Sequence, residues 1–148
     1  MGADLALLPS VAPCPCGRVD AGRRRLALAQ CCGRYVDHFE TAPAPDAESL
    51  MRSRYTAFVL ERIDYLLATW HASQRPQELS VKPAAKWLGL DVKSHRVIDE
   101  THAEVEFVAR YRTTGAAPGS SGQAARQHER SRFVREDGRW FYVDGEEP

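Results

Sequence analysis

The chain has 148 residues, 43% of them hydrophobic, and this length predicts one compact domain with a small appendage. Its 20 Lys and Arg residues balance its 20 Asp and Glu residues, so no overall field draws the protein to nucleic acid or to lipid head groups. No segment is apolar over the roughly 18 residues that a membrane helix needs. We therefore expect no membrane association, and we disfavour a nucleic-acid-binding role.

Two pairs of cysteines stand near the start of the chain. They are Cys14 and Cys16, separated by one proline, and the adjacent Cys31 and Cys32. Adjacent Cα atoms lie about 3.8 Å apart, below the roughly 4.4 to 6.8 Å of a relaxed disulfide, so Cys31 and Cys32 are poorly placed to bridge each other. Four thiolates suit zinc, which is tetrahedral and binds sulfur at about 2.3 Å. We expect a zinc ion held by all four cysteines, and hence a structural ion without an open position for water.

Glycine and arginine residues around the cysteines fit a charged and sharply bent metal site. Gly17 and Gly33 follow the two cysteine pairs, where the backbone must turn to aim the sulfurs at one point. Between Cys14 and Arg34 the chain carries five Arg and one Asp, and five minus one leaves a surplus of four positive charges. This surplus offsets the net negative charge of four thiolates on one divalent ion.

Two disulfides, each joining one cysteine of the first pair to one of the second, are the alternative use of these residues, and free buried thiols are a third. Disulfides of this kind belong to exported proteins. Residues 1 to 13 carry no early Lys or Arg and only a short apolar patch, so they do not resemble an export signal. The sequence therefore favours zinc over disulfides.

The domain organisation follows from the changes in composition along the chain. Residues 1 to 13 predict a poorly ordered tail, and the good helix formers at 23 to 30 predict a short helix that delivers the second cysteine pair. The prolines of residues 41 to 45 predict an extended connector. We therefore assign residues 1–41 to the tail and the cysteine segment, and residues 42–148 to the main α+β domain.

Two helices are expected after the connector. Asp46 is a suitable N-cap, and apolar residues follow it at three- and four-residue intervals. They are Leu50, Met51, Tyr55, Phe58 and Val59. The pattern resumes over residues 63 to 70, where Asp64 is the expected cap of a second, shorter helix. We therefore expect a break between Leu60 and Asp64, and then an irregular crossing from Pro76 to Pro83.

The periodicity changes to alternation after this crossing, and β-branched and aromatic residues become frequent, which is typical of strands. The predicted strands are residues 87 to 98, 103 to 112, 127 to 136 and 139 to 144. Asp99 to Thr101 predicts a turn, and Asp137-Gly138 predicts a tight hairpin between the last two strands. The Gly-, Ser- and Ala-rich tract of residues 113 to 125 predicts a mobile loop.

The fold class that these elements predict is α+β, with two N-terminal helices packed on a curved antiparallel sheet of about four strands. A hollow under the helices is then a candidate ligand pocket. Its candidate lining residues are Tyr55, Trp70, His71, Arg110, Glu129, Ser131 and Trp140. Each of these residues also has a structural interpretation. The aromatic residues can belong to the core, and His71 can cap a helix C-terminus, where a positive charge is favourable. Arg110 can form an ion pair with Glu129 across the sheet.

Several motifs in the chain resemble known families. Cys14 to Gly17, followed by Cys31 to Gly33, resembles the SEC-C motif, a zinc-binding cysteine motif also found at the C-terminus of the SecA preprotein translocase. Later runs are similar to the YchJ family of bacterial proteins. These runs are Leu50 to Tyr55, Tyr65-Leu66, Thr69 to His71, Trp87 to Leu90, Phe107 to Arg110 and Glu129 to Phe133.

The resemblance implies a zinc knuckle joined to a cone of the nuclear transport factor 2 type, in a cytoplasmic bacterial protein without an established role. The chain departs from the family pattern in one place, because the fourteen residues from Gly17 to Gln30 make a longer loop between the cysteine pairs than is usual there. Zinc tolerates a longer loop, since doubling its length costs only about 0.6 kcal/mol. Because the loop differs in length and composition, recognition of a partner by this loop is not carried over from the family.

Three classes of function remain open. The first is a protein-interaction or adaptor module with a structural zinc and a protein partner, and we favour it. The second is a small-molecule-binding protein or small enzyme that acts through the hollow, with His71 or Glu129 as general base. The chain has no paired carboxylates, no Ser-His-Asp arrangement and no phosphate-binding glycine loop, so no catalytic residues are predicted. Nucleic-acid binding through the arginine-rich cysteine segment is the third and least favoured.

Overall fold

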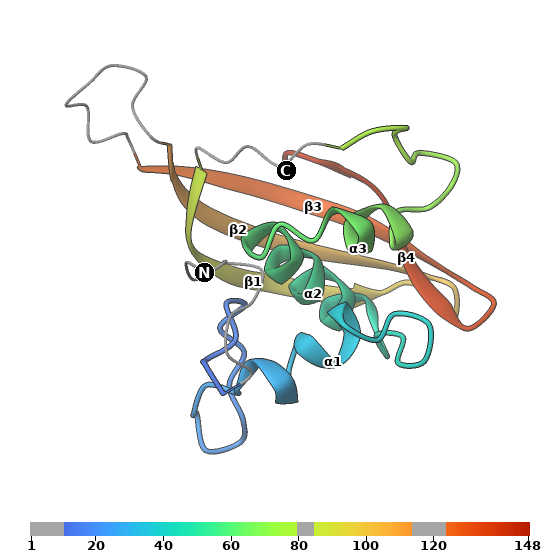
Figure 1. Cartoon of the computed structure of the whole chain (residues 1–148). Helices are drawn as coiled ribbons and strands as arrows, with labels where there is room; N and C mark the ends of the chain where they lie inside the picture. The colour runs from blue at the N-terminus through green and yellow to red at the C-terminus, as the bar shows by residue number, and fades with distance from the viewer. Residues whose placement is uncertain (1–10, 80–84, 114–123) are drawn as a thin grey trace.

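Two layers, a sheet and a group of helices, make up the body of the protein in the computed structural model, which describes residues 11–79, 85–113 and 124–148 (Figure 1). Most of the predicted tail and of the predicted mobile loop lies outside these residues. No helix within them is long and apolar enough to cross a membrane.

The sheet is an antiparallel meander of four strands in the order β1-β2-β3-β4. The strands are β1 (Ala85–Val97), β2 (His102–Thr113), β3 (Ala124–Glu136) and β4 (Arg139–Glu146). Asp137 and Gly138 both have positive φ, at 51° and 77°, as a two-residue hairpin turn between β3 and β4 requires. The four predicted strands are therefore confirmed, with ends that differ by a few residues.

Irregular pairing bends this sheet. The register shifts between Trp87 and Gly89 and between Val92 and Ser94 on β1, and again between Arg132 and Phe133 on β3. Such bulges insert an extra residue on one strand, and the strand bends and twists more strongly there. The predicted curvature of the sheet has this local origin.

The helices are short, apart from one. They are a 3-10 turn at Leu28–Gln30, α1 (Gly33–Val36), α2 (Ala47–Val59) and α3 (Ile63–Ala68). The Asp46 side chain caps α2, because its Oδ1 accepts a 2.7 Å hydrogen bond from the Ser49 N–H. The chain leaves α2 through Glu61, whose φ is 57°, so the predicted break between the two helices is confirmed.

Two details of the predicted helices are wrong. Residues 23 to 30 do not form a helix, because Arg25 and Ala27 lie in isolated β-bridges and only Leu28–Gln30 makes a 3-10 turn. A helix this short is marginal in water, and the contacts of the cysteine segment override its propensity. Asp64 does not cap α3 either: it lies in the first turn and pairs with Arg62, which occupies the cap position but makes no capping hydrogen bond with its side chain.

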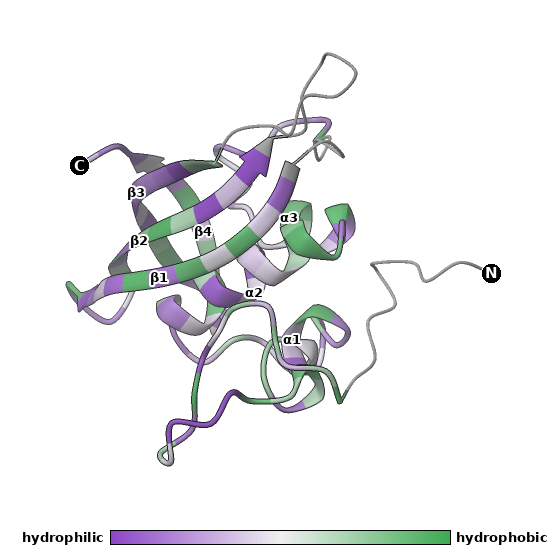
Figure 2. Cartoon of the chain, turned by 90° about the vertical axis from the view of Figure 1, so that its left-hand side faces the viewer, coloured by the Kyte–Doolittle hydropathy of each residue, from purple (hydrophilic) through white to green (hydrophobic). Residues whose placement is uncertain are grey.

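Helices α2 and α3 cover one face of the sheet (Figures 1 and 2). Alternate residues of β2 are buried on that face, among them Val105, Phe107 and Ala109, and Phe133 of β3 joins them. The four cysteines belong to the same hydrophobic cluster as these residues. The α+β layering is confirmed, and the cysteine segment shares a core with the sheet and helices.

The cap of α2 gives a first test of this fold. We expect Asp46→Ala to lower the free energy of unfolding by about 1 kcal/mol, because the Ser49 N–H loses its acceptor, whereas Asp46→Asn should retain most of the stability. Urea unfolding followed by circular dichroism measures both. Asp64→Ala is the control and should cost less, since Asp64 is exposed and caps nothing. An equal loss in the two alanine variants would contradict this role of Asp46.

Candidate functional site

The four cysteine side chains converge on one buried point. Their sulfur atoms all lie within 4.8 Å of one another, and the sulfurs of Cys16 and Cys31 are 3.5 Å apart. A tetrahedral ion with metal–sulfur bonds of about 2.3 Å places its four sulfurs about 3.8 Å apart. The donor set and its spacing therefore fit a tetrahedral metal ion, which Cys14, Cys16, Cys31 and Cys32 would hold.

Local backbone geometry aims the first pair of sulfurs. The Gly17 N–H donates to the Cys14 carbonyl in a tight turn, and Gly17 has a φ of 76°, a conformation that favours glycine. The Cys14 N–H in turn donates to the carbonyl of Leu26 at 2.9 Å. This contact ties the first cysteine pair to the segment that leads to the second.

The second pair is aimed by the junction between the 3-10 turn and α1. The Cys31 N–H donates to the carbonyl of Leu28, the first residue of the 3-10 turn, and so closes that turn. The Tyr35 N–H donates to the carbonyl of Cys32 at the start of α1. Gly33 lies where the two elements cross, and a Cβ there would sit 2.7 Å from the Leu28 carbonyl oxygen. This glycine is needed for close packing and not for a positive φ.

Three arginines bind the backbone carbonyls of the cysteines. Arg25 donates to Cys14 O at 2.7 Å, Arg34 to Cys31 O at 3.1 Å, and Arg52 to Cys16 O at 3.1 Å. Arg25 and Arg34 belong to the predicted basic segment, whereas Arg52 comes from α2. Positive charge therefore surrounds the cluster, as the sequence predicts, and α2 supplies part of it.

Helix α2 also contacts the cluster through Thr56. Its hydroxyl oxygen lies 3.6 Å from the Cys14 sulfur, and both side chains are buried. On the same helix, Glu48 accepts a 2.8 Å hydrogen bond from Arg52 and lies 3.7 Å from Arg18 of the cysteine segment. These contacts fix the cysteine segment on one side of α2.

The thiols interact strongly with one another. Hydrogen bonds with Cys16, Cys31 and Cys32 lower the pKa of Cys14 far below the ordinary thiol value. The hydrogen bond with Cys14, followed by those with Cys16 and Cys31, raises the pKa of Cys32 well above that value. A bound metal ion would supply the positive charge that holds all four groups as thiolates.

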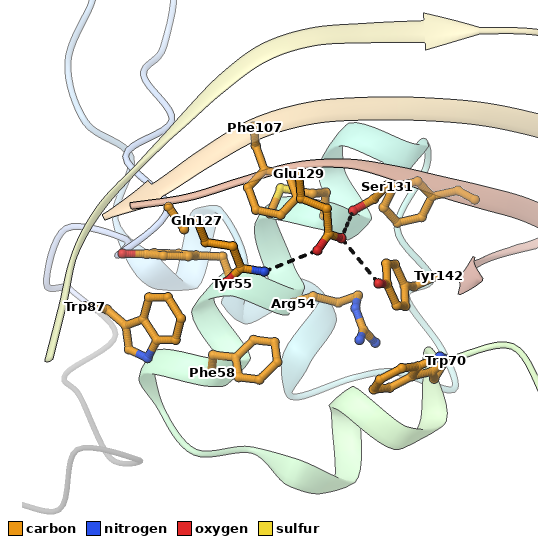
Figure 3. A pocket seen from close by; sticks show the side chains of 13 residues that line it. Arg54, Tyr55, Phe58, Trp70, Trp87, Phe107, Gln127, Glu129, Ser131 and Tyr142 are labelled. Carbon is orange, nitrogen blue, oxygen red and sulfur yellow. Dashed lines mark hydrogen bonds between the residues drawn. The ribbon is translucent and has the colours of Figure 1, made fainter. Parts of the chain in front are cut away.

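Besides the cysteine cluster, the structure has a cavity of about 240 Å³ between α2, Trp70 just after α3, and the inner face of the sheet (Figure 3). Most of its wall is aromatic or apolar, and a few polar groups point into it. The lining residues are Met51, Arg54, Tyr55, Phe58, Trp70, Trp87, Phe107, Ala109, Gln127, Glu129, Ser131, Phe133 and Tyr142. Such a combination of apolar wall and few polar groups is typical of small-molecule sites.

Arg54 of α2 is the buried cation of this cavity, with 6% of its surface exposed. One nitrogen, Nη1, donates to the Leu66 carbonyl and to the Thr69 hydroxyl, both at 2.7 Å. The guanidinium carbon lies 4.6 Å from the centre of the Tyr142 ring and 5.2 Å from that of Trp70. Burial lowers the pKa of Arg54 to about 10, so the group still carries its charge at neutral pH.

Glu129 is the acidic group of the cavity, on β3. Its carboxylate accepts hydrogen bonds from the Ser131 hydroxyl, from the Tyr142 hydroxyl at 3.3 Å and from the Gln127 amide at 3.2 Å (Figure 3). All three donors are neutral, and no ion pair joins Glu129 to Arg54 among the residues that the structure describes. The cavity thus presents one cation and one anion that do not neutralise each other by direct contact.

The structure brings four of the predicted pocket residues together and separates three. Tyr55, Trp70, Glu129 and Ser131 line the cavity. His71, Arg110 and Trp140 lie outside it, and their inclusion in the predicted pocket is corrected.

Each of the three residues lies outside the cavity for a different local reason. The His71 ring lies 2.8 Å from Glu136 and 2.7 Å from Ser73, beyond the end of α3. Arg110 is on the outer face of β2, because the inner face carries the odd-numbered residues. Trp140 pairs with Arg135, two residue pairs closer to the β3–β4 turn than the cavity-lining pair of Phe133 and Tyr142.

The predicted cross-strand pair of Arg110 and Glu129 does not form. Arg110 lies opposite Arg126, and Glu129 lies opposite Phe107. Arg110 instead lies 3.5 Å from Asp91 of β1.

Arg54, Tyr142 and Gln127 are polar residues of the cavity that are absent from the predicted pocket, and only Arg54 carries a signal in the sequence. Arg54 stands four residues after Leu50 and four before Phe58, and therefore on the apolar face of the predicted helix. A charged residue on an apolar helix face is the signal that points to a buried charge. Tyr142 and Gln127 carry no comparable signal, because their direction depends on strand register.

The fold and the cysteine cluster together define a class of protein, namely a domain of the nuclear transport factor 2 type that carries an N-terminal four-cysteine motif. The family model for the middle NTF2-like domain of YchJ matches residues 46–145. The chain therefore belongs to the YchJ-like family.

Relatives and solved structures agree with this assignment. A UPF0225 protein of Polaromonas sp. is 66% identical, covering 95% of this chain and 96% of its own length, and one of Bordetella parapertussis is 52% identical, covering 93% and 94%. A solution structure from Rhodopseudomonas palustris has a TM-score of 0.76 at 29% identity, covering 92% of this chain and 98% of that chain. A crystal structure from Psychrobacter arcticus has 0.74 at 30%, covering 93% and 84%. Both are described as SEC-C motif containing proteins.

Gly33 gives a test of the metal centre. We expect Gly33→Ala to release bound metal to a chelator several times faster than the wild type, because the new Cβ would meet a backbone oxygen at 2.7 Å and displace the second cysteine pair. Gly22→Ala is the matched control, since its Cβ would meet the Asp20 side chain at an ordinary 3.4 Å. Release followed with a coloured metal indicator measures both, and equal rates would refute the packing role of Gly33.

Proposed function

We propose that the four cysteines bind one zinc ion and that this ion is structural. All four coordination positions would be filled by protein sulfur, so none is left for water or substrate. The sulfur atoms are buried and supported by three arginines, which suits a closed site that is not catalytic. Iron also binds four thiolates, and elemental analysis distinguishes the two ions.

We further propose that the protein is an interaction module and that the zinc site stiffens its recognition element. That element is the basic hairpin, residues 18–26, which lies between the cysteine pairs. The Asp20 and Leu26 N–H groups donate to the carbonyls of Arg24 and Arg18, at 2.8 and 3.2 Å. The Asp20 side chain accepts from Gly22 N–H and Arg24 N–H and so closes the turn. The hairpin is therefore ordered by its own hydrogen bonds.

The observation that carries the proposal is the exposed charge on this hairpin. Arg23 and Arg24 are exposed at its turn, and neither has an ion pair among the described residues. Arg25 and Arg18 instead donate hydrogen bonds to Cys14 O and to the Ser49 hydroxyl. In Figure 2 the hydrophilic tip of this segment extends below the sheet and helices. Two exposed guanidinium groups on an ordered backbone turn suit the carboxylates of an acidic protein segment.

The metal has a direct test. Untagged protein purified without added metal should contain about one zinc per chain by elemental analysis. Changing Cys31 and Cys32 to Ser should remove it, while far-ultraviolet circular dichroism still reports the sheet. Iron in place of zinc, or less than half a zinc per chain, would count against the proposed ion.

The partner is tested by charge reversal on the hairpin. Arg23→Glu with Arg24→Glu should abolish capture of an acidic protein from lysate while the zinc content stays normal. The matched control is Arg112→Glu with Arg126→Glu, the same charge change at exposed positions of β2 and β3, which should leave capture intact. Mass spectrometry identifies the captured proteins, and a nuclease-treated sample removes nucleic acid. Retention by the hairpin variant, or loss of capture after nuclease treatment, would overturn the proposal.

A second candidate function rests on a different observation. The aromatic cavity with Arg54 and Glu129 supports the binding of a small molecule under α2. Of the two candidate general bases, His71 lies outside the cavity, and Glu129 is held by three neutral donors. Binding without chemistry is therefore the form of this candidate that the side chains support best.

A further inference from the structure

The cavity holds a buried cation, Arg54, that the carboxylate on its wall, Glu129, does not contact in an ion pair. A guanidinium group has five N–H donors, and Arg54 uses only Nη1 for its bonds to Leu66 and Thr69. Nε and Nη2 have no hydrogen-bond acceptor, and no carboxylate lies within ion-pair distance of the group, among the residues that the structure describes. Buried charges in proteins are normally paired or bind an ion, so Arg54 lacks a partner.

The hydrogen bonds of Arg54 leave one edge of its guanidinium group without an acceptor among the described residues. Trp70 and Tyr142 lie near the guanidinium carbon, at 5.2 and 4.6 Å from their ring centres, and Figure 3 shows the group beside both rings. Since Nη1 is occupied, the free edge of the group is the one formed by Nε and Nη2. This edge carries two parallel N–H bonds, the geometry that binds a carboxylate through both of its oxygens.

We propose that the cavity binds a small carboxylic acid with an apolar, preferably aromatic, body, and that Arg54 binds its carboxylate. This inference rests on the second candidate function, because it names the ligand class of that same cavity. Arg54 then has a binding role in addition to its structural one, which is to join α2 to α3 through the hydrogen bonds of Nη1.

The rest of the wall fits the body of such a ligand. Phe58 and Trp87 lie 5.9 Å apart between ring centres, and Tyr55 meets Trp87 edge to face at 5.6 Å. Phe107 and Ala109 contribute from β2. A volume of about 240 Å³ is below the roughly 300–1,000 Å³ of most ligand sites, so the ligand is small.

Glu129 restricts where the ligand carboxylate can lie. Its own charge repels a second carboxylate, and three neutral donors hold it on the β3 wall. The ligand carboxylate is therefore directed to the free edge of Arg54. A donor on the ligand, such as a hydroxyl or amino group, would find an acceptor in Glu129.

The three tryptophans of the chain provide the measurement. Trp70 and Trp87 line the cavity, whereas Trp140 lies outside it. The probes are benzoate, phenylacetate and 3-phenylpropionate, each compared with its own neutral amide. Titration of zinc-loaded, ¹⁵N-labelled protein should shift the indole signals of Trp70 and Trp87 and leave that of Trp140 in place. We expect at least one carboxylate to bind about tenfold or more tightly than its amide.

Two variants separate the binding role of Arg54 from its structural one. Arg54→Lys keeps the charge but loses the two-pronged contact, and we expect it to weaken carboxylate binding about tenfold while the amides are unaffected. Glu129→Gln removes the repulsion, and it should leave phenylacetate binding unchanged or tighter. If the lysine variant does not fold, the comparison of carboxylates with amides on the wild type decides alone.

The outcomes distinguish failure of the carboxylate inference from failure of the second candidate function, which is small-molecule binding in the cavity. Equal binding of acids and amides, with shifts at Trp70 and Trp87, would overturn the anion inference and leave the cavity as a ligand site. If neither acids nor amides shift these two signals at millimolar concentration, both the inference and the second candidate function are wrong. Shifts that include Trp140 to the same extent would show surface binding and overturn the inference as well.

Discussion

Helix α2 is the constraint on which both candidate sites depend. Arg52 and Thr56 contact the cysteine cluster, while Arg54, Tyr55 and Phe58 line the cavity. Arg52 and Arg54 are two residues apart, about 200° around the helix, so they face nearly opposite ways. Asp46 fixes where this helix begins and Glu61 where the chain leaves it. The thirteen residues of α2 therefore hold the cysteine cluster and the cavity at fixed places on either side.

Much of this arrangement follows from local patterns in the sequence. The apolar spacing after Asp46 predicts α2, and the Asp137-Gly138 pair predicts the last hairpin, because each pattern depends on a few neighbouring residues. The same holds for the two close cysteine pairs, which predict a shared metal site because thiol chemistry leaves few alternatives. The motifs from Leu50 onward also resemble the family to which the chain belongs.

The features that could not be predicted depend on contacts between distant residues. Residues 23 to 30 have helix-forming composition, yet the bridges Val19–Arg25 and Pro13–Ala27 determine their conformation. The exclusion of Arg110 from the hollow depends on strand register, because a slip of one residue exchanges the two faces of a strand. Trp140 is two positions from Tyr142, and it lies outside the hollow because it is two residue pairs nearer the β3–β4 turn. Arg54 was detectable from its place on the apolar helix face, although its neighbours Trp70 and Tyr142 were not.

The burial of Arg54 is hard to explain by stability alone. A desolvated cation is costly, and apolar replacements for buried charged groups are often neutral or stabilising. The tie between α2 and α3 uses one nitrogen of the group, and Ser53 and Tyr65 already join the same two helices through a 2.7 Å hydrogen bond. The remaining N–H donors of Arg54 and the two rings near its guanidinium contribute nothing to that tie. A strained or costly feature beside a cavity is where function is expected to override stability, and an anion in that cavity would use the donors that the fold leaves free.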